Sequence, residues 1–481
     1  MAVEESDPAV RALLPVSGHL ERGIIGLPSA VAQSAAMVAP TAGIVATVAF
    51  IAGYAGLASP LTFAIGTVIC LCIGVVVGEY ARRIPTAGAF YSYLKGTFGP
   101  ATGFVAGVVL GISYFVVFGF QIGFFSSFAQ GLTAGAGFPV PWQVFAVAMF
   151  CLSVGLAVAG VKPSLRTGLI ALAIECAILL IVGLLIVVKG GAAGNSFAPF
   201  NWAHSLKGQS GLWIAVVYTI FSFTGFESAT TLGEEVKRPK RNIPLAVVGT
   251  VLVIGIFETF MSYASVIGYG TSKAGTAALV SAPSPITSLA ERYGNSFLSF
   301  LVTLAIVSSF TALNVVTVSA LSRMAYSMSQ DGLLPKMARK LNKRRAPGNA
   351  AIAIGGTALI LILILGTAYG PEVLASWTSY FATLFWIVAY VFVVFGIVRF
   401  MWVKRRSEAS WFLHGVVPLV AFGGLVWVAY GNVHPLPPAP LDYFIWVTIG
   451  VIALIAVLAY WLRRNRPEIV QRAGYIFESN D

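Results

Sequence analysis

Charged residues are scarce in this sequence. Asp, Glu, Lys and Arg make up 10% of its 481 residues, and hydrophobic residues make up 58%. An average soluble domain is about 25% charged, so a globule of this composition lacks the polar groups to cover its surface. The composition excludes an ordinary soluble enzyme, a disordered chain and a secreted disulfide scaffold, and it indicates a polytopic membrane protein.

The motifs of catalysis and nucleotide binding are also lacking. The sequence has no GxxxxGK[ST] loop and no HExxH pattern, and its four histidines fall near loops or span ends. The four cysteines lie in apolar runs without metal-ligand spacing, as is typical of small buried hydrophobic residues. We therefore expect no enzyme, no ATP-driven pump, no metal and no cofactor.

Long uncharged stretches predict an all-α membrane protein with twelve transmembrane helices. No charged residue occurs in 23–78 or in 96–161, and each stretch is long enough for two crossings of about 20 residues. Breaks between crossings are expected near 56–60 and 135–141. The other eight spans are expected at about 166–188, 211–235, 242–268, 296–328, 349–368, 372–400, 411–431 and 443–463.

The distribution of Lys and Arg predicts the orientation. Cytoplasmic loops of membrane proteins are enriched in basic residues. If both termini (1–23 and 464–481) are cytoplasmic, 26 of the 30 basic residues lie inside. The four outside are Lys189, Lys207, Lys273 and Arg292. The net charge of +12 then reflects topology in a multi-pass plasma-membrane protein and implies no nucleic acid partner.

Two spans are predicted to be broken at membrane depth. Pro40 lacks an N–H group and interrupts the first span, and Gly225 interrupts the sixth. Either break alone is consistent with a simple kink. Spans one and six run in opposite directions, however, which is the arrangement of inverted repeats with a binding site at the midplane. We expect repeats at 24–188 and 211–400, with two further spans within 411–463.

Several motifs resemble the amino acid–polyamine–organocation superfamily. They are Phe221–Ser228 (FSFTGFES), Glu234–Pro244 (EEVKRPKRNIP), Glu79 with Arg83, Pro85, Ala87, Gly88 and Tyr91, and Ser322–Tyr326 with Asp331–Pro335. The resemblance implies a LeuT-like fold and an amino acid permease, a secondary active transporter that works by alternating access.

One departure from the family pattern keeps alternatives open. The family's Gly-Ser-Gly in the first helix falls on Thr41-Ala42-Gly43, which keeps the last glycine alone. An amine or polyamine transporter, or an exchanger of the same fold, therefore remains an alternative to an amino acid permease. A non-transporting sensor or a channel is an alternative of another class.

The two breaks supply the predicted substrate site. Free N–H groups at the start of a half-helix, here those of Thr41, Ala42 and Gly43, suit a carboxylate. Free carbonyl groups at the breaks accept hydrogen bonds from an ammonium. By resemblance of position, walls are expected on spans three, eight and ten. The predicted site comprises Ala39, Pro40, Thr41, Ala42, Gly43, Ser222, Phe223, Thr224, Gly225 and Phe226, with Tyr114, Asn314 and Trp377 as wall residues.

Acids inside the spans predict ion coupling. An ionisable side chain at the bilayer centre costs about 2.5–3.5 kcal/mol on insertion scales, so Glu175 is a candidate proton carrier, with a protonated structural glutamate as the alternative. Glu227 resembles a family acid and is predicted to act in binding or coupling, or to cap the next half-helix. Glu258 is expected to be structural. Ser308 and Ser309 would ligate sodium if sodium replaces the proton, with a structural role as the alternative, because Ser in membrane helices usually bonds its own backbone.

Overall fold

The computed structural model describes residues 22–159, 161–282, 284–434, 436 and 439–465. Nearly all regular structure in these ranges is helical; the β-structure among them is one isolated bridge between Ile25 and Val236. The prediction of an all-α protein is confirmed. Most of the predicted terminal segments, 1–23 and 464–481, lies outside the described residues.

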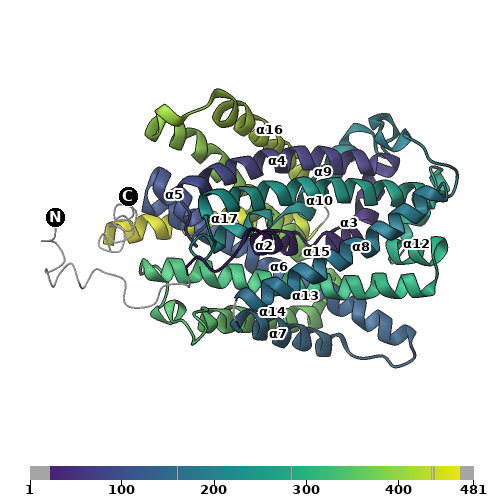
Figure 1. Cartoon of the computed structure of the whole chain (residues 1–481), viewed down its shortest axis with the longest axis horizontal. Coiled ribbons are helices and arrows are strands. Elements are labelled where there is room, and N and C mark those ends of the chain that lie inside the picture. The colour runs from purple at the N-terminus through teal and green to yellow at the C-terminus, as the bar shows by residue number, and fades with distance from the viewer. Residues whose placement is uncertain (1–21, 160, 283, 435, 437–438, 466–481) are drawn as a thin grey trace, which may run out of the picture.

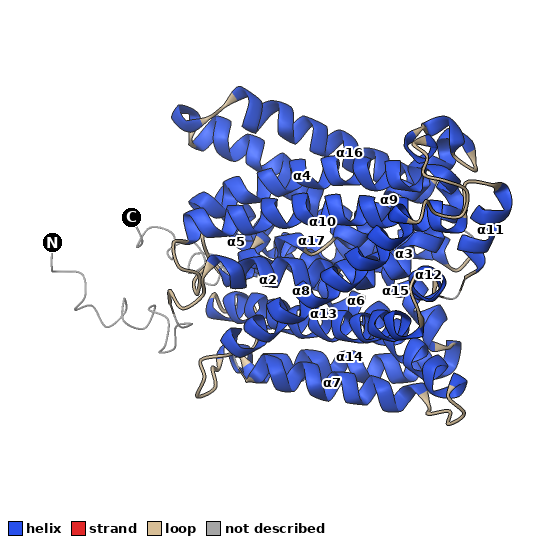
Figure 2. Ribbon diagram, turned by 45° about the vertical axis from the view of Figure 1, so that its right-hand side comes forward, coloured by secondary structure: helices blue, strands red, loops and turns tan. Residues whose placement is uncertain are grey.

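The long helices run side by side along one axis (Figures 1 and 2). Helices α7 and α14 form one edge of the bundle, α4 and α16 the opposite edge, and the short helices α5 and α11 lie at opposite ends. The α-helices are α2 (Leu27–Val38), α3 (Pro40–Ala55), α4 (Ser59–Arg83), α5 (Phe90–Phe98), α6 (Pro100–Gly135), α7 (Trp142–Val158), α8 (Val161–Val188), α9 (Gly208–Phe223), α10 (Pro239–Tyr269), α11 (Lys273–Ser281), α12 (Pro285–Tyr293), α13 (Ser296–Gln330), α14 (Gly348–Tyr369), α15 (Pro371–Arg399), α16 (Val417–Val433) and α17 (Leu441–Asn465).

Helix length and composition fit a bilayer. Within the described ranges, ten helical stretches are long and apolar enough to cross a membrane. One of them, Leu27–Arg83, has 57 residues, which is enough for two crossings of about 20 residues each. Helix α7 is apolar but has 17 residues, or about 26 Å at 1.5 Å per residue. The count of twelve spans and the five-plus-five repeat stay predictions.

Both predicted helix breaks are present. Helix α2 ends at Val38, Ala39 takes a left-handed φ of 52°, and α3 begins at Pro40. Helix α9 ends at Phe223, and Gly225 has a φ of 97° before the 3₁₀ segment η5 (Phe226–Leu232). The first break is shorter than expected, because a proline is well accommodated at the first position of a helix. Thr41, Ala42 and Gly43 therefore already belong to α3.

The two broken segments are bonded to each other. Ser34 Oγ donates to the carbonyl of Phe226 at 2.5 Å, and Ser228 Oγ donates to the carbonyl of Gln33 at 3.1 Å. A Cβ atom on Gly225 would overlap the side chain of Met37. The end of α2 thus supplies polar partners to η5, which lacks the regular hydrogen bonds of an α-helix.

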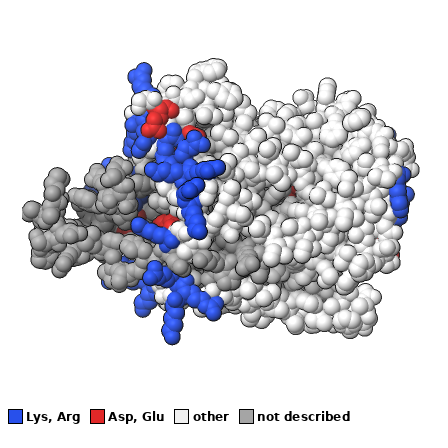
Figure 3. All heavy atoms as spheres, in the orientation of Figure 1, with Lys and Arg blue, Asp and Glu red and all other residues white. Residues whose placement is uncertain are grey.

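Basic residues gather at one end of the bundle. Figure 3 shows Lys and Arg side chains clustered at the end that holds α5, with few along the middle. Two buried ion pairs lie at this end, Lys95–Asp331 at 2.8 Å and Arg323–Glu235 at 2.6 Å. They tie α13 to α5 and to the segment that precedes α10.

Candidate binding site

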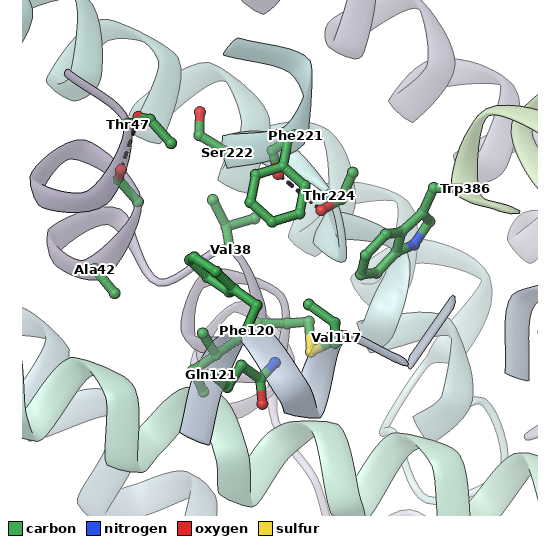
Figure 4. A pocket seen from close by; sticks show the side chains of 13 residues that line it. Val38, Ala42, Thr47, Val117, Phe120, Gln121, Phe221, Ser222, Thr224 and Trp386 are labelled. Atoms are coloured by element: carbon green, nitrogen blue, oxygen red, sulfur yellow. Dashed lines mark hydrogen bonds between the residues drawn. The ribbon is translucent and has the colours of Figure 1, made fainter. Parts of the chain in front are cut away.

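A small cavity lies between the two breaks. Its space amounts to about 30 Å³, whereas one water needs about 10–15 Å³ on the same measure. Figure 4 shows Thr47 and Ala42 on one side and Trp386 on the other. The lining residues are Met37, Val38, Ala42, Gly43, Thr47, Val117, Phe120, Gln121, Phe221, Ser222, Thr224, Leu313 and Trp386. A molecule larger than a few waters fits only if these walls move apart.

The predicted site residues divide between the cavity and its surroundings. Ala42, Gly43, Ser222 and Thr224 line it. The other predicted residues of the two breaks, and Tyr114, do not line it. In the first break, Ala39 and Pro40 lie behind the cavity and Thr41 faces Glu175. In the second break, Phe223 and Phe226 are fully buried and Gly225 packs on Met37, while Tyr114 contacts Glu227.

Two of the predicted wall residues are turned away from the cavity. Trp377 packs against Tyr369 and Phe444, with ring centroids 4.9 and 6.3 Å apart. Asn314 is buried and donates to the carbonyl of Phe310, one turn earlier in α13, at 2.9 Å. The aromatic wall from α15 is Trp386 instead, which the sequence analysis missed.

Two of the N–H groups predicted to meet a ligand are already bonded. The Gly43 N–H donates to the Ala39 carbonyl at 2.7 Å, and the Ala42 N–H donates to Ser309 Oγ at 3.3 Å. The regular first turn of α3 and the serine on α13 account for this. Ser309 therefore acts in this conformation as a partner for the start of α3.

Glu227 is surrounded by hydrogen-bond donors. It receives hydrogen bonds from Tyr114 Oη at 2.7 Å, Tyr390 Oη at 2.8 Å, Trp386 Nε1 at 3.2 Å and the Gly225 N–H at 3.1 Å. Bonds to a carboxylate are stronger than those between neutral groups. Glu227 thus fastens α6 and α15 to the break in the sixth span, and Trp386 connects it to the cavity wall.

Glu175 on α8 lies beside α3 and α13. The residue is 2% exposed, and its carboxyl group faces the hydroxyl groups of Thr41, Ser308 and Ser309. Over the described ranges, neither Glu175 Oε1 nor Thr41 Oγ1 has a hydrogen-bond partner. The structure therefore brings three of the residues predicted for ion coupling together, whereas Glu227 belongs to a separate cluster.

Glu258 on α10 is also completely buried. Ser222 Oγ donates to its Oε2 at 2.9 Å, and Oε1 has no partner among the described residues. Buried polar groups normally have a hydrogen-bond partner, which Ser222 supplies here, and the structural role expected for Glu258 stays a prediction. The position of Glu258 in an otherwise apolar span was the sequence signal for it.

A bundle of apolar helices with two broken helices around a buried cavity defines a multi-pass membrane transporter. The profile of the "Amino acid permease" family matches residues 25–461. The chain belongs to this family, and the predictions of a secondary transporter and of the superfamily are confirmed.

Curated relatives cover most of the chain. The branched-chain amino acid permease BcaP of Lactococcus lactis subsp. cremoris is 26% identical over 86% of this chain and 89% of its own. The methylthioribose transporter of Bacillus subtilis is 22% identical over 87% of this chain and 88% of its own. The low-affinity putrescine importer PlaP of Escherichia coli is 24% identical over 83% of this chain and 85% of its own. These relatives are transporters, not enzymes.

A solved structure supports the fold. MhsT in complex with L-phenylalanine superposes with a TM-score of 0.60 at 15% identity, covering 85% of this chain and all of that one. MhsT has the LeuT fold, so the predicted LeuT-like fold is confirmed.

Proposed function

We propose that this chain transports amino acids with apolar side chains, which bind in the cavity between the two breaks. The observation that carries the proposal is the composition of the lining. Val38, Val117, Phe120 and Leu313 supply apolar surface, while Ser222 and Thr224 supply polar groups beside the break. Burying an aliphatic side chain in such surroundings is favourable by about 1.5–3 kcal/mol.

Transport proceeds by alternating access in this proposal. The cavity is too small for an amino acid, so binding requires movement of its walls. Phe221 and Trp386 belong to those walls, and each is attached to the sixth-span break, Phe221 by the chain and Trp386 through Glu227. A change in conformation at the break would therefore open the cavity.

The orientation we propose places the basic end of the bundle in the cytoplasm, with both termini on that side of the plasma membrane. The cluster of Lys and Arg at the α5 end (Figure 3) supports it, because cytoplasmic loops are enriched in basic residues. The lipid bilayer would then surround the band between the two ends.

Protons are the proposed coupling ions, and Glu175 is the proposed carrier. Its partly unpaired carboxyl group beside α3 supports this role, since a proton on the carboxyl removes the cost of a buried charge. Ser308 and Ser309 on the same side would serve a sodium ion in the alternative mechanism. We assign Glu227, which is saturated with donors, to closing the site.

Counterflow in proteoliposomes tests the proposal. Vesicles loaded with unlabelled leucine should accumulate external labelled leucine above its equilibrium level, while a channel or a sensor produces no such accumulation. Putrescine tests the second candidate, an amine transporter, which is favoured by Glu258 Oε1, a buried oxygen beside Gly43 that has no hydrogen-bond partner among the described residues. Accumulation of putrescine without leucine would replace the first candidate by the second.

A further inference from the structure

Ser222, on the cavity wall, has two oxygen neighbours but carries one hydrogen. Its hydroxyl oxygen lies 2.8 Å from the Thr219 carbonyl oxygen and 2.9 Å from Glu258 Oε2. A hydroxyl group donates one hydrogen bond and accepts up to two. Serines in helices commonly donate to a carbonyl group of the preceding turn, which here is the shorter contact. Both contacts are complete hydrogen bonds if Glu258 is protonated and donates to Ser222.

Among the described residues, no positive charge neutralises Glu258. Its side chain is completely buried, and the ion pairs of the described ranges do not include it. The titratable groups that face it are the thiols of Cys70 on α4 and Cys176 on α8, and a thiol carries no positive charge. A buried carboxylate without a cation is strongly unfavourable, so the neutral acid fits this environment better.

The described charged side chains of the helices packed against α10 have other neighbours or are exposed. Those with other neighbours are Glu227 on η5, Glu175 on α8, and Glu79 with Arg82 and Arg83 on α4. The exposed ones are Lys273 on α11 and Glu291 and Arg292 on α12. Glu258 therefore depends on its apolar surroundings and on Ser222.

Gly43 on α3 covers the other oxygen of Glu258. A Cβ atom at Gly43 would lie 2.9 Å from Glu258 Oε1, so the helix backbone packs against this oxygen and leaves no room for a ligand atom. Oε1 has no hydrogen-bond partner in the described part of the chain. An unpaired oxygen costs less on a neutral group than on a charged one. The close approach of α3 therefore also favours the protonated acid.

We propose that Glu258 is protonated in this conformation and positions Ser222 by donating its carboxyl hydrogen to the Ser222 hydroxyl oxygen. Ser222 belongs to the last turn of α9 and lines the cavity. A proton on Glu258 thus fixes the first half of the sixth span against α10, next to the break. Loss of the proton leaves a buried charge and one hydrogen too few, which destabilises this arrangement of the wall. The proposal rests on the substrate cavity proposed above and adds a proton on which its shape depends.

Two variants of Glu258 separate this role from packing. Binding is measured in nanodiscs as displacement of labelled leucine, from acidic to alkaline pH. Wild-type affinity should fall by about tenfold at alkaline pH, the effect of losing one hydrogen bond at a buried group. Glu258→Gln has a similar shape and an amide that donates at every pH, so it should keep wild-type affinity and lose the alkaline decrease. Glu258→Met fills the space without a donor and should bind leucine about tenfold more weakly already at acidic pH.

Two further variants assign the pH profile. Glu291→Gln, on the exposed face of α12, is the control and should show the wild-type profile. Ser222→Ala removes the acceptor of the carboxyl hydrogen. It should bind leucine as weakly as Glu258→Met at acidic pH, and combining the two changes should cause no further loss, because both remove the same bond.

Thermal unfolding supplies a readout without substrate. A group that binds its proton more tightly in the folded state makes stability fall as pH rises. The unfolding temperature of the wild-type protein should therefore fall more towards alkaline pH than that of Glu258→Gln, and more than that of Ser222→Ala if Glu258→Gln does not fold.

An alkaline decrease in affinity that persists in folded Glu258→Gln overturns the proposal, as does a wild-type affinity that is constant over this range. Unfolding profiles that are the same in the wild-type protein and the variants also overturn it. If the wild-type protein binds no leucine at any pH while the unfolding profiles differ as expected, the proposed substrate is wrong and the proton on Glu258 is supported.

Discussion

Tyr114 on α6 donates a hydrogen bond of 2.7 Å to Glu227, the carboxyl group that follows the break in the sixth span. The two residues are 113 positions apart in the chain. Tyr390 on α15 donates to the same carboxyl group at 2.8 Å. Three spans are thus joined at one carboxylate next to the cavity.

Removing either phenol should weaken this junction. Tyr114→Phe or Tyr390→Phe keeps the ring and leaves one site on a buried carboxylate without a donor, which costs about 1–3 kcal/mol. We expect a lower unfolding temperature and a lower maximal uptake rate in proteoliposomes. Tyr430→Phe, at an exposed ring on α16, is the control and should match wild type. Unchanged unfolding and uptake in both buried variants would remove Glu227 from the closing mechanism.

Gly225 should tolerate no side chain. Its φ of 97° disfavours other residues, and a Cβ would overlap Met37. Gly225→Ala should therefore abolish leucine counterflow and lower the unfolding temperature. Gly249→Ala, in the interior of α10 with nothing near its Cβ position, should retain transport and gain up to about 1 kcal/mol. Equal behaviour of the two variants would contradict this account of the break.

Replacing only Lys95 of the ion pair Lys95–Asp331 should lower the free energy of unfolding. Both side chains are at most 5% exposed, and Tyr91 also donates to Asp331. Burial and the neighbouring Asp331 raise the pKa of Tyr91 well above its usual range, so the phenol keeps its proton at neutral pH. Lys95→Met should cost about 3–5 kcal/mol by leaving a buried charge unpaired.

A double-variant cycle checks this prediction. Lys95→Met combined with Asp331→Asn should be less destabilised than Lys95→Met alone, as measured by thermal unfolding in nanodiscs. Additive losses in the double variant would mean that the two side chains are not energetically coupled.

Glu175 should be required for uptake driven by a pH gradient and not for counterflow. Glu175→Gln removes the proposed proton carrier, so uptake driven by an inward pH gradient should be lost, while counterflow, which needs no net proton movement, should persist. Glu372→Gln, at an exposed residue on α15, should keep both activities. Gradient-driven uptake by Glu175→Gln at the wild-type rate would exclude this carrier, and dependence on a sodium gradient would favour Ser308 and Ser309.

The sequence predicted the backbone of the site better than its walls. Pro40 and Gly225 interrupt helices through local chemistry, so both breaks could be found without knowledge of the fold. The residue of α15 that lines the cavity could not be found in this way. Trp377 and Trp386 are nine residues apart, or two and a half turns at 3.6 residues per turn, and therefore lie on opposite faces of a helix that is apolar on all sides.

The partners of the buried acids were equally hidden. Glu227 meets Tyr390 across 163 residues, and Gly43 meets Glu258 because α3 packs against α10. Such contacts depend on how the helices are rotated about their axes, and hydrophobic periodicity carries no such information when both faces are apolar. Because charged residues are scarce, the acids inside the spans stood out in the sequence. The residues that contact them did not.

The break in the first span consists of Ala39 alone. Because α2 and α3 are joined by this single residue, their relative direction depends on its two backbone dihedral angles, φ and ψ. A tilt of α3, with Gly43 at the cavity, would therefore turn about Ala39 while α2 stays anchored to η5 by Ser34. A left-handed alanine costs about 1–2 kcal/mol relative to a right-handed one, so this pivot stores energy that a rearrangement of α3 would release.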